Sequence, residues 1–345
     1  MAALSADFTL PLRAFELELA LEVERTVALV GPSGAGKTSV LRAIAGLVRP
    51  SRGRIALGDD VWFDSAHRLF RRPDERRVGL VFQEYALFPH LTVRQNIAYA
   101  GRERADEYLE RFRISHLADE RPGALSGGER QRVALARSLA RGPGTILLDE
   151  PLSALDSHTK GTVRAELQEL LRELALPTIL VTHDFEDAAA LADHVGVIVD
   201  GRLRQFATPD VLVDRPSDAF VASFTGANLL RGIARSDRGD ITRIRLETGE
   251  FVFSTEHAVG DVGVVVYPWE VSVARLHQDD SAMNTIEGEI RSVVTIGNRV
   301  RVRIGPITAE VTTGSAEKLD LARGGIAFAT FKATGARLVP LTRPD

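Results

Sequence analysis

The sequence predicts an α/β domain with a mainly parallel sheet, followed by an all-β domain. Up to about residue 225, short apolar runs alternate with helical patterns, as expected for strand, helix, strand units. From Asn228 the helical runs stop, and short alternating segments punctuated by glycine replace them. A chain of 345 residues also exceeds one ordinary core. We therefore expect two domains, residues 1–225 and 226–345.

The composition excludes several classes of protein. Hydrophobic residues make up 44% of the chain and charged residues 26%, as in a globular protein. No apolar run approaches the ~20 residues of a membrane-spanning helix and no signal peptide is predicted, so the chain is expected inside the cell. The absence of cysteine excludes disulfides and thiol catalysis. A net charge of −4 argues against nucleic acid as a partner.

The first elements are predicted to be strands. Residues 7–23 alternate imperfectly between apolar and polar side chains, which predicts two short antiparallel strands. The apolar run Thr26-Val27-Ala28-Leu29-Val30 predicts a buried parallel strand, and residues 39–46 predict a helix.

Between that strand and that helix lies the stretch GPSGAGKT, residues 31–38, which fits the phosphate-loop pattern at every position. Glycines let the backbone approach a polyphosphate, and the N–H groups and helix N-terminus attract its oxygens. Lys37 is expected on the β and γ phosphates, and the Thr38 hydroxyl on Mg²⁺. The residues expected to bind the nucleotide here are Gly31, Pro32, Ser33, Gly34, Ala35, Gly36, Lys37, Thr38 and Ser39.

Lysine is rare in this chain, with four residues against 39 arginines, which singles out Lys37. Aromatic residues just before a phosphate loop often stack on adenine. Phe15 is the first choice for this role and Phe8 the second, while a core phenylalanine is the alternative for each.

Residues 68–77 contain a cluster of arginines that is expected to be a solvated loop. The run Arg77-Val78-Gly79-Leu80-Val81-Phe82-Gln83 then predicts a strand that ends in a polar residue, Gln83. The Gln83 carboxamide is expected to reach Mg²⁺ or the attacking water from this position.

The next region, residues 84–140, is predicted to be a helical subdomain. It contains LSGGERQRVALAR, in which Ser126, Gly127 and Gly128 open a helix. A hydroxyl and free N–H groups at a helix N-terminus favour an anion. This stretch resembles the signature sequence of ABC-type ATPases. One chain with two phosphate-directed helix ends suggests a dimer in which each signature faces the nucleotide of the other subunit.

The run Thr145-Ile146-Leu147-Leu148-Asp149-Glu150 predicts an apolar strand that delivers two carboxylates at its carboxyl end, where ligands bind in doubly wound sheets. Asp149 is expected to hold Mg²⁺ and Glu150 to act as general base. Side chains of successive strand residues point to opposite faces, so the two carboxylates can take different roles.

Two further features match the ABC family. Ser153-Ala154-Leu155-Asp156 resembles its D-loop, which implies that Asp156 contributes to the site across the dimer. The strand predicted over 177–182 ends at His183, which resembles the family's switch histidine and implies a contact with the γ-phosphate. The resemblance covers residues 1–225 and implies ATP, Mg²⁺ and a second copy of the chain.

The last part of the chain carries a faint repeat of about 55 residues that opens at Asn228 and at Asn284. It predicts two small barrels of the oligonucleotide-binding type, residues 228–277 and 281–341. Such tails are common in ABC import ATPases.

The second repeat resembles molybdate-binding Mop domains, through Ser281-Ala282-Met283-Asn284 and Lys332-Ala333-Thr334. This resemblance implies an oxyanion site at Ser281 and Lys332. Met283 stands where those domains usually carry arginine, and a plain surface lysine is the alternative for Lys332. The tail is expected to sense the imported oxyanion.

The sequence as a whole predicts an ATP-binding subunit of an ABC importer, peripheral to the cytoplasmic face of the cell membrane. The implied partners are two integral membrane permease subunits, contacted near Phe88, Pro89 and His90, and an external substrate-binding protein. The predicted cargo is molybdate or a similar oxyanion. Sulfate, ferric iron or a polyamine are alternatives, as is a soluble ABC ATPase of DNA repair or translation.

Overall fold

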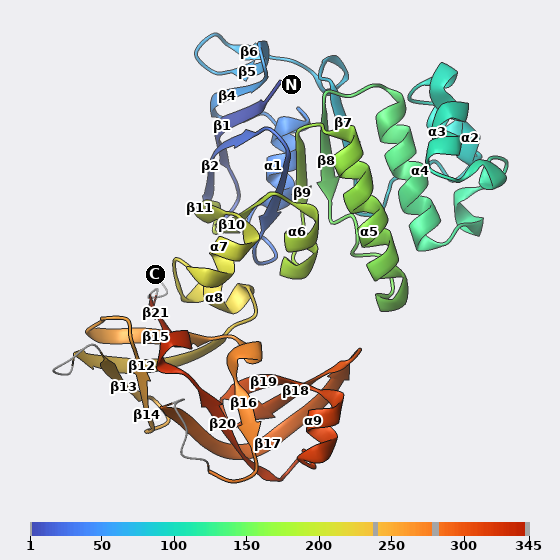
Figure 1. Cartoon of the computed structure of the whole chain (residues 1–345). Helices are drawn as coiled ribbons and strands as arrows, with labels where there is room; N and C mark the ends of the chain where they lie inside the picture. The colour runs from blue at the N-terminus through green and yellow to red at the C-terminus, as the bar shows by residue number, and fades with distance from the viewer. Residues whose placement is uncertain (1, 237–240, 278–282, 342–345) are drawn as a thin grey trace. The chain divides into compact units, whose positions relative to one another are not determined.

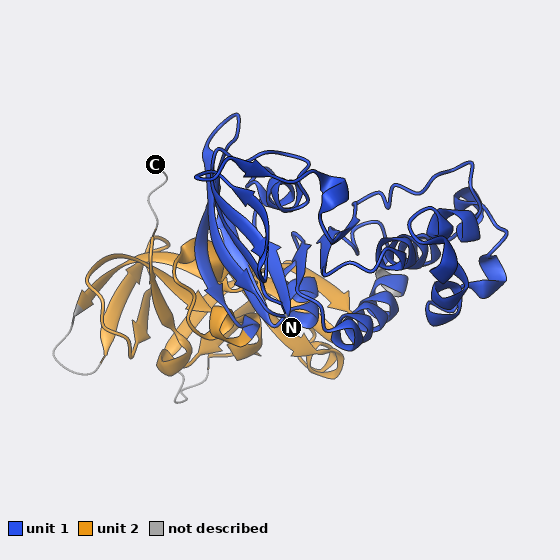
Figure 2. Ribbon diagram, turned by 90° about the horizontal axis from the view of Figure 1, so that it is seen from above, with its two compact units in different colours: residues 1–209 blue, residues 210–345 orange. Residues whose placement is uncertain are grey.

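The computed structural model describes residues 2–236, 241–277 and 283–341, apart from the side chains of residues 157, 158 and 236. The chain divides into two compact units, Met1–Pro209 and Asp210–Asp345 (Figure 2). The second unit therefore begins earlier in the chain than the boundary expected after residue 225. Residues before that boundary belong to it because Ala219 and Ala222 form an apolar cluster with Val265, Tyr267 and Val339.

The first unit is built on one sheet of eleven strands, in the order β6-β5-β4-β1-β2-β11-β10-β3-β9-β8-β7 (Figure 1). Its strands are β1 (Leu4–Pro11), β2 (Glu16–Val23), β3 (Thr26–Val30), β4 (Arg52–Leu57), β5 (Asp60–Asp64), β6 (Leu69–Phe70), β7 (Val78–Val81), β8 (Thr145–Asp149), β9 (Thr178–Val181), β10 (His194–Val199) and β11 (Arg202–Ala207).

The sheet has an antiparallel half and a parallel half. Strands β1 and β2 pair antiparallel with Leu4 opposite Val23, and every second side chain of β2 is buried, as the alternation predicts. Strands β10, β3, β9, β8 and β7 pair parallel, and β3, β8 and β9 are buried at every residue. The parallel pairing of these buried strands brings the carboxyl ends of β3, β9, β8 and β7 to one edge of the sheet.

Six α-helices and several short 3₁₀ turns accompany the described part of this sheet. They are α1 (Lys37–Ile44), α2 (Val93–Ala98), α3 (Ala105–Arg111), α4 (Gly127–Ala140), α5 (Ser157–Leu174) and α6 (Phe185–Leu191), with η1 (Pro73–Glu75), η2 (Arg102–Arg104), η3 (Ser115–Leu117) and η4 (Pro122–Ala124). Among the described residues, no helix is long and apolar enough to cross a membrane.

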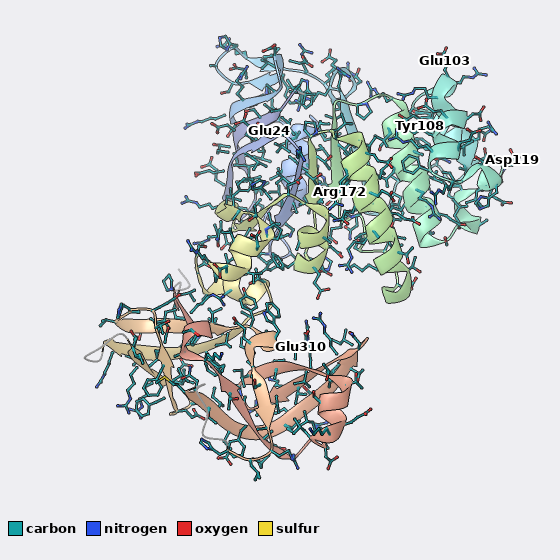
Figure 3. The ribbon with its side chains drawn as sticks, viewed as in Figure 1. Glu24, Glu103, Tyr108, Asp119, Arg172 and Glu310 are labelled. Atoms are coloured by element: carbon teal, nitrogen blue, oxygen red, sulfur yellow. The ribbon has the colours of Figure 1, made fainter. Side chains whose placement is uncertain are left out.

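Helices α2, α3 and α4 pack together as the helical subdomain. Tyr108 of α3 is buried within it, whereas Glu103 and Asp119 are exposed on its surface (Figure 3). Thr92 caps α2, and its hydroxyl accepts a hydrogen bond from the amide of Gln95. Long loops and single turns join these helices, so the region is less helical than its sequence pattern predicts.

The arginine cluster at residues 68–77 is not entirely solvated, contrary to the expectation. Arg76 is 1% exposed, and its Nη1 donates to the carbonyls of Ala43 and Ile44 at 2.9 and 2.6 Å. Those carbonyls end the helix that follows the phosphate loop, and a cation is favoured at a helix C-terminus. Burial nevertheless lowers the pKa of Arg76 to about 10.

The second unit contains short helices and two five-stranded antiparallel sheets. Its elements are α7 (Pro209–Asp214), α8 (Ala219–Phe224), β12 (Asn228–Ser236), β13 (Thr242–Leu246), β14 (Phe251–Ser254), β15 (Gly260–Val266), η5 (Pro268–Glu270), β16 (Ser272–Ala274), β17 (Asn284–Ile296), β18 (Arg299–Ile304), β19 (Ile307–Thr312), α9 (Thr313–Lys318), β20 (Ile326–Phe331), η6 (Ala333–Gly335) and β21 (Arg337–Pro340).

The two repeats are not separate barrels along the chain, because they exchange their last strands. The sheet orders are β14-β13-β12-β15-β21 and β16-β20-β17-β18-β19, so β21 joins the first repeat and β16 joins the second. The division into units 228–277 and 281–341 is corrected accordingly. Two sheets that share one apolar core bury more surface than two separate small barrels would.

The two asparagines that open the repeats have a structural function. The Asn228 amide exchanges two hydrogen bonds of 2.7 Å with the backbone of Thr308, in the second repeat. The Asn284 amide does the same with the backbone of Phe253, in the first repeat, at 2.6 and 2.9 Å. Each repeat is thus tied to the other by the residue that opens it.

Candidate functional site

The sequence-predicted site residues of the first unit lie mainly at one edge of the sheet. The phosphate loop follows β3, Gln83 follows β7, Asp149 ends β8 and His183 follows β9. Since these strands are parallel neighbours, the side chains that follow them meet at the carboxyl edge of the sheet. This is the edge at which doubly wound sheets bind their ligands.

The phosphate loop has the backbone that its glycines predict. Gly31, Gly34 and Gly36 have φ angles of 147°, 85° and 100°. A β-carbon on Gly31 would lie 2.0 Å from the carbonyl oxygen of Ile198, so only glycine fits. The Lys37 ammonium donates to the carbonyls of Gly31 and Pro32 at 2.9 and 2.8 Å. Burial lowers the pKa of Lys37, while the Glu150 and Asp149 carboxylates oppose that shift.

Thr38 and Asp149 form a pair of oxygen donors. The Thr38 hydroxyl donates to Asp149 Oδ1 at 3.0 Å, across the space between α1 and β8. Asp149 is 8% exposed, and burial raises its pKa, although the hydrogen bond from Thr38 acts in the opposite direction. A hydroxyl beside a carboxylate, with a carboxamide close by, is the kind of donor set that Mg²⁺ prefers. The residues present therefore fit that ion.

Glu150 contacts both of the other residues predicted to be catalytic, Gln83 and His183. Its Oε2 lies 3.2 Å from His183 Nδ1 and accepts a hydrogen bond of 3.4 Å from Gln83 Nε2. Its backbone has a φ of 46°, in the left-handed region that residues with a β-carbon rarely adopt. The backbone change directly after β8 separates the Glu150 side chain from that of Asp149, so the two carboxylates face different partners.

The signature residues occupy a helix N-terminus, as predicted. Ser126 caps α4, and its N–H and Oγ both donate to Glu129 Oε2 at 2.7 Å. The hydrogen bond from the Ser126 hydroxyl lowers the pKa of Glu129. Among the described residues, no hydrogen bond or ion pair joins residues 126–128 to residues 31–38. Within one chain, the two predicted phosphate-directed ends are therefore not joined.

The predicted D-loop leads into α5, where Asp156 Oδ1 accepts a hydrogen bond of 3.0 Å from the Thr159 amide. One residue further on is Lys160, which the sequence reasoning missed. The Lys160 ammonium lies 2.6 Å from an Asp184 oxygen and 2.7 Å from an Asp187 oxygen. Since Asp184 directly follows His183, this cluster joins the D-loop helix to the histidine. A rare lysine four residues after Asp156 was the only signal.

A protein-family profile matches part of each of the two units. The ABC transporter family profile matches residues 15–153, and the TOBE domain profile matches residues 280–336. The trehalose/maltose import ATP-binding protein MalK of Thermococcus litoralis is 38% identical over 315 residues, which cover 84% of each chain. The chain belongs to the ABC import ATP-binding proteins. It hydrolyses ATP to energise an importer and carries a TOBE domain at its C-terminal end.

Further relatives of this ABC import ATPase differ in the cargo that they are named for. The sulfate/thiosulfate import ATP-binding protein CysA of Salmonella typhimurium is 40% identical over 284 residues, 78% of this chain and 75% of the relative. Other relatives are named for ferric iron or for spermidine and putrescine. The dimeric ATP-binding cassette MJ0796, bound to ADP and Pi, is similar in structure, with a TM-score of 0.50 and 29% identity over 60% of this chain and 98% of that chain. The named relatives favour an importer over an ATPase of DNA repair or translation.

The two phenylalanines considered for adenine differ in accessibility. Phe8 is 2% exposed and belongs to the core of the ABC import ATPase, so it cannot stack on a base there. Phe15 is half-buried and lies beside the phosphate loop, since a β-carbon on Gly36 would be 3.6 Å from its ring. Of the two, Phe15 is therefore the candidate for stacking on adenine.

The oxyanion residues of the TOBE region are only partly described. Ser281 lies outside the described residues. The Lys332 side chain is exposed at the N-terminus of the turn η6. Met283 is 52% exposed with a φ of 60°. Of the two described residues of this motif, Asn284 is buried, and its amide is hydrogen-bonded to the backbone of Phe253.

Proposed function

We propose that the chain works as one half of a homodimer that closes on two molecules of Mg-ATP, hydrolyses them and reopens. The observation that carries this proposal is the separation of Ser126–Gly128 from the phosphate loop within one chain, since both are helix N-termini suited to phosphate. In a head-to-tail pair, Ser126, Gly127 and Gly128 of one copy would cover the γ-phosphate held by the other, and Asp156 would lie at the same interface. The dimeric MJ0796 relative is consistent with that arrangement.

The phosphate loop would bind the triphosphate through its amides and through Lys37. The Lys37 ammonium now rests on the carbonyls of Gly31 and Pro32, so it has to turn toward the β and γ phosphates when ATP binds. Burial disfavours the charged ammonium and so lowers the pKa of Lys37. A dianionic partner would offset this cost of burial. Phe15 would stack on the adenine.

Thr38, Asp149 and Gln83 would hold Mg²⁺ through hydroxyl, carboxylate and carboxamide oxygens. The bound ion supplies neutralisation of charge on the phosphate oxygens. Glu150 would take a proton from the attacking water, and His183 would orient the Glu150 carboxylate through the 3.2 Å contact. The left-handed backbone at Glu150 turns its carboxylate toward Gln83 and His183 rather than toward Thr38.

The Glu150→Gln variant tests this catalytic assignment. Since the amide keeps the shape of the side chain but cannot accept the proton, we expect the ATPase kcat to fall by about a hundredfold or more. ATP affinity should stay near the wild-type value, and an ATP-dependent dimer should accumulate on size-exclusion chromatography. Glu22→Gln, an exposed change on β2, is the matched control and should hydrolyse normally. Near-normal hydrolysis by Glu150→Gln would refute the role of Glu150.

The membrane partners are proposed to be two permease subunits that dock on the helical subdomain at the cytoplasmic face, with an external binding protein delivering the cargo. Pro89 and His90 are exposed there, and the Phe88 ring lies 4.7 Å from that of Tyr99, which is 72% exposed. Exposed aromatic residues are enriched at protein interfaces. Copurification of permease subunits with the tagged chain, and their loss on Tyr99→Asp, tests this docking.

For the cargo we favour a tetrahedral oxyanion, with molybdate ahead of sulfate. Lys332-Ala333-Thr334 and the sulfate/thiosulfate relative support this class, while sugar, polyamine and ferric iron relatives support the alternatives. A lysine, hydroxyls and backbone N–H groups suit a dianion.

Isothermal titration of the full chain should give heat with molybdate and tungstate, and Lys332→Met should abolish it. Heat with sulfate alone would transfer the assignment to sulfate, and no heat with any of the three would remove the oxyanion site.

A further inference from the structure

The loop that follows Gln83 has an unusual backbone. Tyr85 and Ala86 are successive residues with φ angles of 61° and 45°. Residues with a β-carbon avoid this left-handed region, and two in succession persist only where other contacts hold them. The Tyr85 side chain is itself buried and anchors the loop at this point.

The contacts that hold this pair come from Arg137 on α4, the helix that begins at the signature. Its Nη2 donates to the Tyr85 carbonyl and its Nη1 to the Ala86 carbonyl, both at 2.8 Å. The same guanidinium lies 5.3 Å from the centre of the Phe88 ring. One side chain therefore contacts three of the four residues from 85 to 88.

Arg137 makes these contacts without an acidic partner. No ion pair is formed by Arg137 within the described part of the chain, and burial lowers its pKa. A guanidinium presents its donors as a rigid planar fork, which suits two adjacent carbonyls. Lysine, with one ammonium on a flexible stem, cannot reproduce that geometry.

The loop is fixed at both ends. At its start, Gln83 donates to Glu150 at the catalytic edge. At its far end, the buried Asn96 amide accepts a hydrogen bond of 2.8 Å from the Phe88 N–H and donates to the Phe88 carbonyl at 3.2 Å. Arg137 lies between these anchors and on the same rigid helix as Ser126. Arg137 therefore links the signature helix directly to the loop.

We propose that Arg137 is a positioning residue that couples the position of the signature helix to the placement of Gln83 against Glu150. This inference rests on the proposed function. When α4 moves to cover the nucleotide of a second copy, Arg137 carries the Tyr85 and Ala86 carbonyls with it. Without Arg137 the left-handed pair relaxes, and Gln83 loses its contact with Glu150 although ATP still binds to the phosphate loop.

The test compares Arg137→Met and Arg137→Lys with Arg141→Met in the purified full chain. Arg141 is the matched control, because it is an exposed arginine at the end of the same helix that also donates to a backbone carbonyl, that of Asp74 in η1. We expect Arg137→Met to lower the ATPase kcat by about tenfold or more while KM and the Kd for ATP stay within about twofold. Arg137→Lys should recover only part of kcat, and Arg141→Met should match the wild type.

Hydrogen exchange separates positioning from simple structural support. In Arg137→Met the amides of residues 83–88 should exchange faster, while those of the phosphate loop and α4 keep wild-type protection. Wild-type kcat in Arg137→Met would overturn the inference, as would faster exchange spread over the whole helical subdomain. If the unmodified chain hydrolyses no ATP, it is the proposed function that fails. If the unmodified chain hydrolyses ATP and Arg137→Met equals it, only the role of Arg137 fails.

Discussion

At Asp149, the ionised carboxylate proposed to hold Mg²⁺ lowers the stability of the folded chain. The Asp149 carboxylate is buried, and burial raises its pKa above the ordinary value. An acid whose pKa is raised by folding binds its proton more tightly in the folded chain than in the unfolded one. The resulting loss of stability begins as the pH rises past the unfolded pKa and is complete above the folded one, so the ionised carboxylate costs stability at neutral pH.

Asp149→Asn should therefore stabilise the nucleotide-free protein while it damages catalysis. The amide removes the buried charge and keeps an oxygen that can accept the hydrogen bond from Thr38. We expect the thermal midpoint of the first unit to rise by about 2 °C at pH 7, and the gain to disappear near pH 4. Differential scanning calorimetry at both pH values measures this. A lower midpoint at pH 7 would mean that the carboxylate stabilises the fold.

The residues of the site differ in how far the sequence could predict them. Lys37, Thr38, Asp149 and Glu150 belong to short motifs whose local order dictates their geometry. The long-range contacts of Arg76, Arg137 and Lys160 were not predicted, because these partners lie 32 to 33, 51 to 52 and 24 to 27 residues away. Only the folded chain brings such groups together. An arginine that donates to backbone carbonyls has no complementary side chain that a sequence pattern could show.

At the scale of the element, helices α5 and α6 are joined by charges rather than by apolar contacts alone. Lys160 bridges Asp184 and Asp187, and Arg164 lies 3.4 Å from Asp187, whose side chain is 5% exposed. Burial acts to lower the pKa of Lys160, but the hydrogen bonds to the two aspartates outweigh it and raise the pKa above its ordinary value. The cluster fixes the start of α6, and with it the backbone next to His183.

Lys160→Met should destabilise the first unit by about 2 kcal/mol, because it leaves the buried Asp187 carboxylate with one cationic partner instead of two. Lys160→Arg should keep most of the stability. Urea unfolding followed by far-ultraviolet circular dichroism measures the difference. A double mutant, Lys160→Met with Asp187→Asn, should recover part of the loss, and strictly additive losses would exclude the proposed ion pair as the cause.

At the scale of the whole molecule, the sequence predicts two architectures and the order of their parts. Both are borne out, as an α/β ATPase unit and an all-β region with two antiparallel sheets. The exchange of β16 and β21 between the repeats could not be predicted. These strands have only three and four residues, and nothing in so short a segment specifies which sheet edge it joins.

The exchange predicts that the TOBE region unfolds as one cooperative unit. Asn284→Ala removes both hydrogen bonds to the Phe253 backbone at a site with no exposure, so we expect a loss of about 2 kcal/mol. Calorimetry of the full chain should show a single lowered transition for this region. Asn228→Ala should lower the same transition by a similar amount. Two separate transitions, one per repeat, would contradict the shared core.

The strand exchange also has a consequence for biosynthesis. Domains generally fold from the N-terminus as the ribosome releases them. The sheet formed by β12, β13, β14 and β15 cannot gain its fifth strand until residues 337–340 have emerged, after β17 to β20 of the second repeat. During that interval the edge of β15 presents unpaired backbone groups to its surroundings. Nascent chains of this protein are therefore most exposed to aggregation late in translation, and a pause before β21 would prolong that exposure.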